Sequence, residues 1–300
     1  MNRLTGILLV VISAATFGSL AIFGRFAYAA GLNVSTLLFL RFTFSAVGMV
    51  GLLLLRHEPL PRGTTLAQLV GMGAVGYVGQ SLCYLTAIQY ASAGLVALLL
   101  YLYPTFVAIL SSLVLKTRLT RLKILALGLA TAGAALTANP REGQWTGIVL
   151  AVSAAAIYAV YIIVGTGVMQ KVSSFQSSAI IFASAGAVFG LLASVQGPRW
   201  PTTSQGWLAV GGIVLFATII PVATFLAGLK RIGPTDASML STLEPVVTVL
   251  LAALLLGESL QPHSLLGGGL ILAAVLLLTG PQLRHPGLSN EGDFHADREI

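Results

Sequence analysis

The sequence predicts an all-α polytopic membrane protein, built as two inverted repeats of five transmembrane helices with both termini in the cytoplasm. Three observations predict this fold: an apolar composition, ten apolar stretches of membrane-spanning length, and an internal repeat. Of 300 residues, 56% are hydrophobic and only 8% are charged, and the mean hydropathy is +0.93. Soluble domains are about 25% charged, so this composition excludes a secreted enzyme, a nucleic-acid binder and a disordered chain.

A helix needs about 20 mainly apolar residues to cross a bilayer. Charged and proline-rich breaks divide the chain into ten stretches of this kind. In the first half they cover residues 4–24, 32–55, 66–88, 92–115 and 122–138. In the second half they cover residues 144–168, 175–196, 206–229, 234–256 and 262–280.

The basic residues predict the orientation. With the N-terminus in the cytoplasm, twelve of the 16 Lys and Arg residues fall in cytoplasmic segments, three fall outside, and Arg41 lies within a span. Cytoplasmic loops of membrane proteins carry an excess of Lys and Arg, so both termini are predicted to be cytoplasmic. The net charge of +7 is therefore a topology signal, and we expect the lipid bilayer, but no nucleic acid, as a partner.

The chain repeats itself at an offset of 141 residues. Residues 5–7 and residues 146–148 both read Thr-Gly-Ile, and at the same offset Pro104 falls on Pro245. Because five spans is an odd number, the second copy must enter the membrane from the opposite side, as in many transporters. The first span corresponds to an internal one, so we expect it to be retained and not cleaved as a signal peptide. The chain is divided into repeats 1–140 and 141–283 and a flexible cytoplasmic tail, 284–300.

Four short motifs carry a resemblance to a known family. They are Tyr103-Pro104, Glu244-Pro245-Val246, Gly257-Glu258 and Gly267-Gly268-Gly269. With the paired spans, they resemble the drug/metabolite transporter superfamily, EamA type, from residue 1 to about residue 283. The sequence is most similar to YddG-type exporters of aromatic and other amino acids. The resemblance implies a ten-span secondary transporter that exports amino acids across the bacterial inner membrane by alternating access.

One departure from the family pattern is visible. The glutamate that is usual after the fourth span is replaced by Lys116-Thr117-Arg118. A symmetric role for Glu258 is therefore in doubt, and we expect Glu258 and Asp236, which lie near span ends, to be solvated.

Polar and aromatic residues inside the spans predict a substrate cavity between the repeats. In the third span, Tyr77, Gln80, Ser81 and Tyr84 have the spacing of one helical face. Aromatic walls with a few hydrogen-bonding groups suit a small amphiphilic solute. The candidate substrate-binding residues are Phe17, Tyr77, Gln80, Ser81, Tyr84, Tyr101, Tyr158, Tyr161, Thr218, Ser241 and Glu244. The alternative is that each hydroxyl bonds a neighbouring helix and only holds the bundle together.

Arg41 and Glu244 are the charges deepest in the predicted spans. Glu244 lies ten residues after Pro234, which is about 15 Å along a helix, and Arg41 lies about 12 Å from the outer start of its span. These depths are compatible with a buried ion pair, whose partners neutralise each other. In the alternative, Glu244 receives a substrate ammonium or a coupling proton.

Three prolines lie inside spans: Pro104, Pro221 and Pro245. Each removes a helix hydrogen bond and bends its span, either as a gating hinge or as a static bend that opens space for a cavity. Gly186 and Gly190 have the small-xxx-small spacing, for which we expect packing within the chain over dimerisation. The sequence leaves the oligomeric state open, and a monomer is compatible with it.

The spans offer no residues for catalysis. All four histidines lie in loops, at a span edge or in the tail, and Glu244 is the only mid-span carboxylate. We therefore expect no enzymatic activity, no metal and no cofactor, and an amino acid as substrate. The alternatives are another metabolite class of the same superfamily, such as a nucleotide-sugar or a drug-like solute, and a channel.

Overall fold

The structure is a computed structural model. It describes residues 3–114, 121–137, 144–169, 171–225, 227–228, 240–241 and 243–284, and every regular element in them is helical. In the first half these are α1 (Arg3–Phe17), α2 (Leu20–Ala29), α3 (Val34–Leu55), α4 (Gly63–Gly71), η1 (Met72–Tyr77), α5 (Val78–Tyr90), α6 (Ala93–Leu100), α7 (Tyr103–Val114) and α8 (Arg121–Thr137). In the second half they are α9 (Gln144–Met169), α10 (Ser174–Gln196), α11 (Ser204–Val214), η2 (Leu215–Ile219), α13 (Leu243–Leu256) and α14 (Pro262–Arg284).

Each of the ten apolar ranges contains a helix or a run of helices in the described residues. Five described segments are long and apolar enough to cross a membrane: Leu4–Ala29, Val34–Leu55, Trp145–Gly165, Ser174–Gln196 and Ser204–Phe225. The all-helical fold with several apolar spans is thus confirmed, whereas the number of ten crossings and the orientation of the termini stay predictions.

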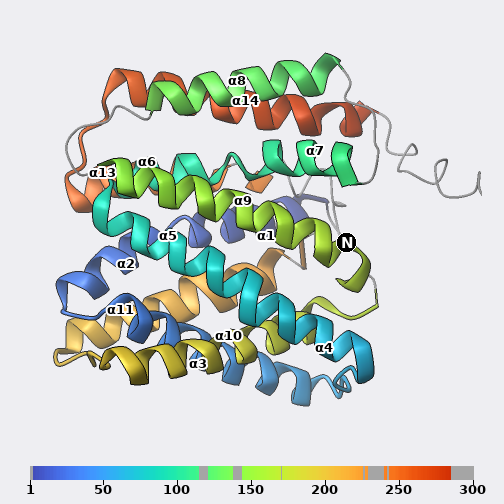
Figure 1. Ribbon diagram of the computed structural model, residues 1–300, viewed down its shortest axis with the longest axis vertical. Coiled ribbons are helices and arrows are strands. Elements are labelled where there is room, and N and C mark those ends of the chain that lie inside the picture. The colour runs from blue at the N-terminus through green and yellow to red at the C-terminus, as the bar shows by residue number, and fades with distance from the viewer. Residues whose placement is uncertain are drawn as a thin grey trace, which may run out of the picture.

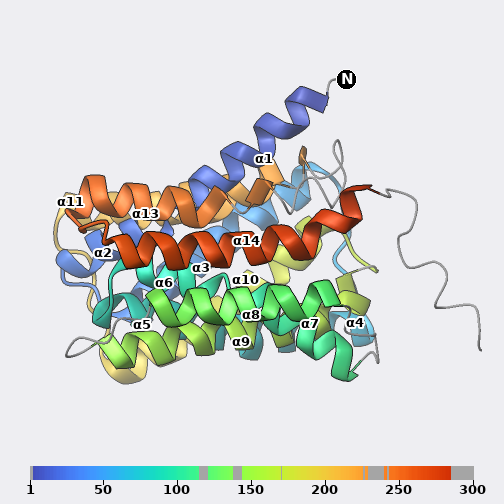
Figure 2. The ribbon, with the colours of Figure 1, turned by 90° about the horizontal axis from the view of Figure 1, so that it is seen from above.

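The two repeats interlock. At the 141-residue offset α3 corresponds to α10 and α8 to α14, and both pairs pack tightly against each other. Figure 1 shows α8 and α14 side by side along one edge of the molecule, with α3 and α10 near the opposite edge. In Figure 2, seen from above, α13 and α14 run along the same side of the bundle. The core is therefore shared between the repeats and does not divide into two separate bodies.

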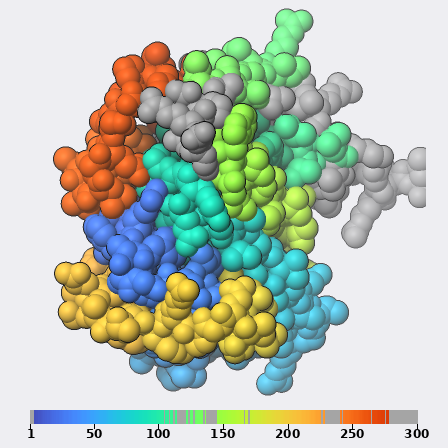
Figure 3. Space-filling model, turned by 60° about the vertical axis from the view of Figure 1, so that its left-hand side comes forward, coloured from blue at the N-terminus to red at the C-terminus, as the bar shows by residue number. Residues whose placement is uncertain are grey.

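Other contacts repeat the same symmetry. α4 and η1 both contact α9, and their counterparts in the second repeat, α11 and η2, contact α2 and α1, which correspond to α9. At the end of the molecule seen in Figure 3, α2 in blue lies between α5 in teal and α11 in gold.

Glycines allow the closest approach of α3 and α10. A Cβ added at Gly186 would lie 3.1 Å from Thr43 Oγ1, and one added at Gly190 would lie 3.0 Å from the ring of Phe39. The two glycines of the small-xxx-small pattern therefore face a helix of the same chain.

The described residues of each repeat contain one π-helical segment, η1 or η2, at matching positions. Shifting η2 by the repeat offset places it on residues 74–78, which overlap η1 and bring Thr218 onto Tyr77. A π-turn inserts an extra residue into a helix and is frequent at functional sites. Nothing in the hydropathy pattern indicated these segments.

Two helices are interrupted in the middle of a predicted span. α1 ends at Phe17 before α2, and α6 ends at Leu100 before α7. In a membrane, the backbone groups freed by such a break need partners. Thr248 Oγ1 supplies one by donating a hydrogen bond of 2.9 Å to the carbonyl oxygen of Gly18. Across the repeats, Ser13 Oγ donates to the carbonyl oxygen of Pro221 at 2.8 Å.

The prolines lie at different points of their helices. Pro104 is the second residue of α7, within the first turn, where a proline removes no helical hydrogen bond. Pro245 is the third residue of α13, but residues 240 and 241 before it are also helical. Pro221 follows η2 inside a continuing helix. In the described residues, Pro221 and Pro245 thus both follow helical residues, whereas Pro104 lies at the start of its helix.

The expectation that Glu258 is solvated is wrong. The backbone N–H of Ala93 donates to Glu258 Oε1 at 2.7 Å, and that of Gly94 donates to Oε2 at 3.2 Å. The carboxylate thus caps the N-terminus of α6, where an anion is stabilised by the helix dipole. Asp236, the other residue expected to be solvated, lies outside the described residues.

Candidate functional site

A continuous series of tyrosine rings runs through the interface between the repeats. Tyr101 packs edge-to-face against Tyr103 with ring centroids 5.8 Å apart, and Tyr103 packs in the same way against Tyr158 at 4.9 Å. Tyr158 lies 5.9 Å from Tyr161, which lies 5.7 Å from Tyr77. The rings come from the break between α6 and α7, from α9 and from η1, so both repeats contribute to this tyrosine cluster. The sequence prediction named all of these residues except Tyr103 as candidate substrate-binding residues.

Phenylalanines extend the cluster on the η1 side. The ring of Phe42 lies 5.5 Å from Tyr77 and 5.8 Å from Phe182, and it stacks on Phe189 at 5.7 Å. The sequence prediction missed these three residues, because a phenylalanine inside an apolar helix gives no signal of where it points. The repeat offset holds one hint, since it places Phe182 at the position that corresponds to Arg41.

Arg41 is buried at this end of the cluster, with a side chain 4% exposed. Its Nε donates a hydrogen bond of 3.1 Å to Thr218 Oγ1, which itself donates to the carbonyl oxygen of Ile213 at 2.9 Å. Its guanidinium lies 5.0 Å from the ring centroid of Phe42. The terminal nitrogens of Arg41 make no hydrogen bond to a described residue. They are also not among the described polar atoms that are both unpartnered and inaccessible to solvent. They therefore remain able to bind a ligand.

Glu244 lies at the other end of the cluster. Tyr101 Oη donates to Glu244 Oε2 at 2.9 Å and also lies 2.9 Å from the carbonyl oxygen of Ser241. No further side chain in the described residues donates to the Glu244 carboxylate, so Oε1 has no protein partner there.

The expected ion pair between Arg41 and Glu244 is not formed in the described structure. Arg41 is held by Thr218 and Glu244 is held by Tyr101, so each charge is bonded to a neutral hydroxyl. Tyr77 and Tyr84 lie within electrostatic reach of both Arg41 and Glu244, so both charges border the tyrosine-lined region. The site therefore holds a cation and a carboxylate that do not neutralise each other by contact.

Five tyrosine hydroxyls of this region make no hydrogen bond to any described residue: those of Tyr77, Tyr84, Tyr103, Tyr158 and Tyr161. None of these hydroxyl oxygens is among the described polar atoms that are both unpartnered and inaccessible to solvent, so each is at least partly accessible. Among the described residues, two tyrosines bond a neighbouring helix as the alternative expected: Tyr101, described above, and the half-buried Tyr28, which donates to the carbonyl oxygen of Leu85 at 2.8 Å.

The remaining predicted residues contribute less directly. Ser81 Oγ donates to Gln80 Oε1 at 3.1 Å, which leaves the Gln80 amide nitrogen as a free donor among the described residues. Phe17 is the last residue of α1, at the break before α2. It makes no ring contact with the tyrosine cluster in the described part of the chain.

Residues 4–139 and residues 145–280 each match the model of the EamA-like transporter family. The chain is 28% identical over 254 residues to "Uncharacterized inner membrane transporter YedA" of Escherichia coli (strain K12), covering 80% of this chain and 79% of the relative. It is 24% identical over 298 residues to "Uncharacterized transporter YcbK" of Bacillus subtilis (strain 168), covering 93% of each chain.

A solved structure, described only as the crystal structure of a protein, has the same fold. Its TM-score is 0.65 at 19% sequence identity, and the match covers 94% of this chain and 99% of the other. The relatives are uncharacterized transporters, so they support the family and not the YddG-type subgroup in particular. The protein is a multi-pass membrane transporter and not an enzyme, and, with both halves of the chain matched, it belongs to the EamA-like transporter family.

Proposed function

We propose that this transporter exports amino acids, aromatic ones included, by alternating access around the site between Arg41 and Glu244. One observation carries the proposal: the two deepest charges of the site are not paired with each other. A charge inside a membrane protein is costly without a partner. A zwitterion supplies both missing partners at once and adds no net charge.

The free atoms have the right chemistry for the two ends of an amino acid. The terminal nitrogens of a guanidinium bind a carboxylate in a bidentate manner, and Arg41 offers them because Thr218 occupies only its Nε. Glu244 Oε1 is available to a substrate ammonium, while Tyr101 holds Oε2. The carboxylate of the substrate is therefore placed towards η2 and its ammonium towards α13.

The tyrosine cluster forms the wall for the substrate side chain. Its rings give an apolar surface, and its unpaired hydroxyls give hydrogen-bond donors and acceptors without fixed charge. Such a wall accepts phenylalanine, tyrosine or methionine with little discrimination, which supports a broad substrate range. The export direction follows the YddG-type resemblance, and the inner-membrane location follows the printed name of YedA.

Counterflow in proteoliposomes tests the proposal. We expect vesicles loaded with unlabelled phenylalanine to accumulate labelled phenylalanine and methionine. Phenethylamine, which lacks the carboxylate, and 3-phenylpropionate, which lacks the ammonium, should both fail to exchange. Flux of a nucleotide-sugar or a drug-like cation without amino-acid flux would overturn the substrate assignment. The same panel with and without an imposed pH gradient shows whether a proton moves with the substrate.

A further inference from the structure

The chain turns from α5 into α6 through residues 91–94, a segment that we call the corner. Its first residue, Ala91, has extended backbone, so no continuous helix joins α5 to α6. Arg25 of α2 donates a hydrogen bond through Nη2 to the carbonyl oxygen of Ala91. Glu258, which lies between α13 and α14, accepts hydrogen bonds from the N–H groups of the first two residues of α6. The corner is therefore held by an arginine of the first repeat and by a glutamate of the second.

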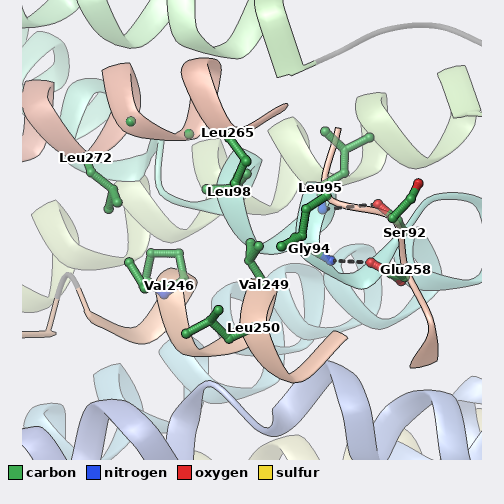
Figure 4. A pocket seen from close by; sticks show the side chains of 15 residues that line it. Ser92, Gly94, Leu95, Leu98, Val246, Val249, Leu250, Glu258, Leu265 and Leu272 are labelled. Carbon is green, nitrogen blue, oxygen red and sulfur yellow. Dashed lines mark hydrogen bonds between the residues drawn. The ribbon is translucent and has the colours of Figure 1, made fainter. Parts of the chain in front are cut away.

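The backbone of the corner is shielded from water, and its polar groups depend on these two side chains. Ala91 is buried, and Figure 4 shows Glu258 beside Ser92 and Gly94, with dashed lines from its carboxylate to the backbone of α6. Arg25 keeps one unused donor, because its Nε is buried and has no partner among the described residues. An unpaired buried donor costs free energy. The held position of the corner is therefore not fully satisfied, as expected of a contact that must also be released.

α6 and α13 connect the corner to the site. α6 begins at the corner and runs about 12 Å to the break at Tyr101, whose hydroxyl bonds Glu244 near the start of α13. α13 packs against α6 and ends two residues before Glu258. This pair of helices is therefore bonded at both ends, by Tyr101 and Glu244 in the site and by Glu258 at the corner. A displacement of the corner is transmitted through the two helices to the Glu244 carboxylate.

α3 and α10, by contrast, are tied together at both ends. Asn33 Nδ2, just before α3, donates to the carbonyl oxygen of Gly197, just after α10, at 3.1 Å. At the far end of the same pair, Gln176 Nε2 of α10 donates to the carbonyl oxygen of Pro59, which follows α3. The two helices also pack tightly against each other. They therefore form one body that spans both repeats, which favours the corner as the place where this end of the bundle opens.

The two charges that hold the corner are not repeated in the sequence. At the 141-residue offset, Thr166 takes the position of Arg25 and Thr117 takes the position of Glu258. Hydrogen bonds of charged groups are stronger than those of neutral groups. Charged partners for such a corner are thus encoded at one end of the bundle and not at the symmetry-related position.

We propose that the corner is a gate of the site between Arg41 and Glu244, which Arg25 and Glu258 hold closed and which opens this end to water only when they release it. At rest the site is then open towards the opposite end, because the charged partners are not repeated at the symmetry-related position. In the predicted orientation the corner lies on the outer side, so the resting transporter loads its substrate from the cytoplasm. The gate refines the alternating access proposed above and rests on it.

Thiol labelling from each side of the membrane tests the gate. Gln80→Cys in a Cys83→Ala background places one thiol in the site, and Ser259→Cys in the same background shows which side the corner occupies. Right-side-out and inside-out vesicles are treated with a membrane-impermeant maleimide. Arg25→Met, which removes the donors, and Glu258→Gln, which removes one acceptor and the charge, should each speed labelling of the site from the corner side about tenfold, the scale of one hydrogen bond to a charged group. Labelling from the other side should become slower.

The opposite changes on the two sides distinguish a gate from a loosened fold. Faster labelling from both sides would mean general loosening, and unchanged rates would mean that the corner does not close the site; either result would overturn the proposal. Asn33→Asp is the matched control, because it removes the donor to Gly197 at the same end of the bundle but keeps the side-chain acceptor that caps α3. Its labelling rates should equal those of the parent, and a change as large as in Arg25→Met would also overturn the gate.

Hydrogen exchange on the unaltered protein gives an independent answer if the variants fail to fold. A gate opens far more often than the whole protein unfolds. The amides of Ala93 and Gly94 should therefore exchange faster than that of Thr36, which is bonded to the Asn33 side chain at the start of α3, by about tenfold or more. Equal protection would overturn the gate. Neither measurement requires amino-acid flux, so absent counterflow with side-specific labelling would overturn only the substrate assignment, and the reverse would overturn only the gate.

Discussion

Tyr101 and Glu244 link the two repeats inside the site, with the Tyr101 hydroxyl donating a 2.9 Å hydrogen bond to Glu244 Oε2. Tyr101 lies at the break between α6 and α7, so the hydroxyl is presented by non-helical backbone in the middle of a predicted span. The same hydroxyl lies 2.9 Å from the carbonyl oxygen of Ser241. The break between α6 and α7 in the first repeat thereby positions Tyr101 so that its hydroxyl orients the Glu244 carboxylate of the second repeat.

Tyr101→Phe keeps the ring and removes only this link. Without the donor, Glu244 loses its fixed orientation, and a hydrogen bond to a charged group contributes about 1.5–3 kcal/mol. We expect phenylalanine to bind at least tenfold more weakly, measured by calorimetry on the purified protein. Tyr28→Phe is the control, because Tyr28 also donates to a backbone carbonyl, that of Leu85, but lies outside the cluster. Equal losses in both variants would contradict a specific role for Tyr101.

Arg41 should decide whether a substrate needs a carboxylate. Arg41→Lys keeps the positive charge but loses the Nε bond to Thr218 and the bidentate geometry. We expect Arg41→Lys to retain weak phenylalanine counterflow and Arg41→Gln to lose it. Thr218→Val tests the support of the guanidinium and should weaken binding less than Arg41→Gln. Full counterflow in Arg41→Gln would show that Arg41 is only structural.

Glu244→Gln should remove the pH dependence of substrate binding. Acid neutralises the wild-type carboxylate and so weakens its attraction for the substrate ammonium, and affinity should therefore fall as pH falls. The glutamine still accepts the Tyr101 hydrogen bond but carries no charge at any pH. We expect a weaker and nearly pH-independent affinity, followed by calorimetry across an acid-to-neutral series. Full transport with an unchanged pH profile would remove Glu244 from the mechanism.

The internal repeat was the most informative part of the sequence. It placed Thr218 at the position of Tyr77, and the structure has π-helical segments at both places, with Thr218 bonded to Arg41. Polar residues at mid-span are identifiable because they stand out against an apolar background. Most of the tyrosine cluster was therefore predictable, since its members differ in kind from the residues around them.

The contacts between apolar surfaces were not predictable in the same way. A membrane helix is apolar on the faces towards lipid and towards protein alike, so its pattern does not show which side packs. Phe42 and Phe182 gave no signal for this reason. The role of Glu258 was missed because its partners are backbone N–H groups of α6, which are 164 or more residues away in the chain.

Glu258→Ala should destabilise the fold by removing the acceptor of two N–H groups at the start of α6. The N-cap residue Ser92 remains, so we expect a loss of about 0.5–1.5 kcal/mol, the scale of a hydrogen bond. We expect a lower melting temperature in detergent without added lipid, and a smaller decrease for Glu258→Gln, which keeps one acceptor. Gln261→Ala is the control, because its side chain bonds only the nearby Ser259 at an exposed site. An unchanged melting temperature in Glu258→Ala would show that water replaces the carboxylate.

Two glycines of α8 should respond oppositely to alanine. A Cβ at Gly133 would lie 2.6 Å from the carbonyl oxygen of Gly267 and 3.0 Å from the backbone nitrogen of Ile271. These are backbone atoms of α14, so Gly133→Ala must push the two helices apart, at a cost of about 1–3 kcal/mol. At Gly128 a Cβ meets nothing within 4 Å.

Gly128→Ala should therefore be neutral or slightly stabilising, because alanine has a higher helix propensity than glycine. The melting temperatures of the two variants in detergent give the comparison on one helix. Because α8 and α14 are equivalent helices of the two repeats, pushing them apart should also weaken the packing of one repeat against the other. Equal melting temperatures would mean that α8 and α14 do not pack as closely as the structure shows.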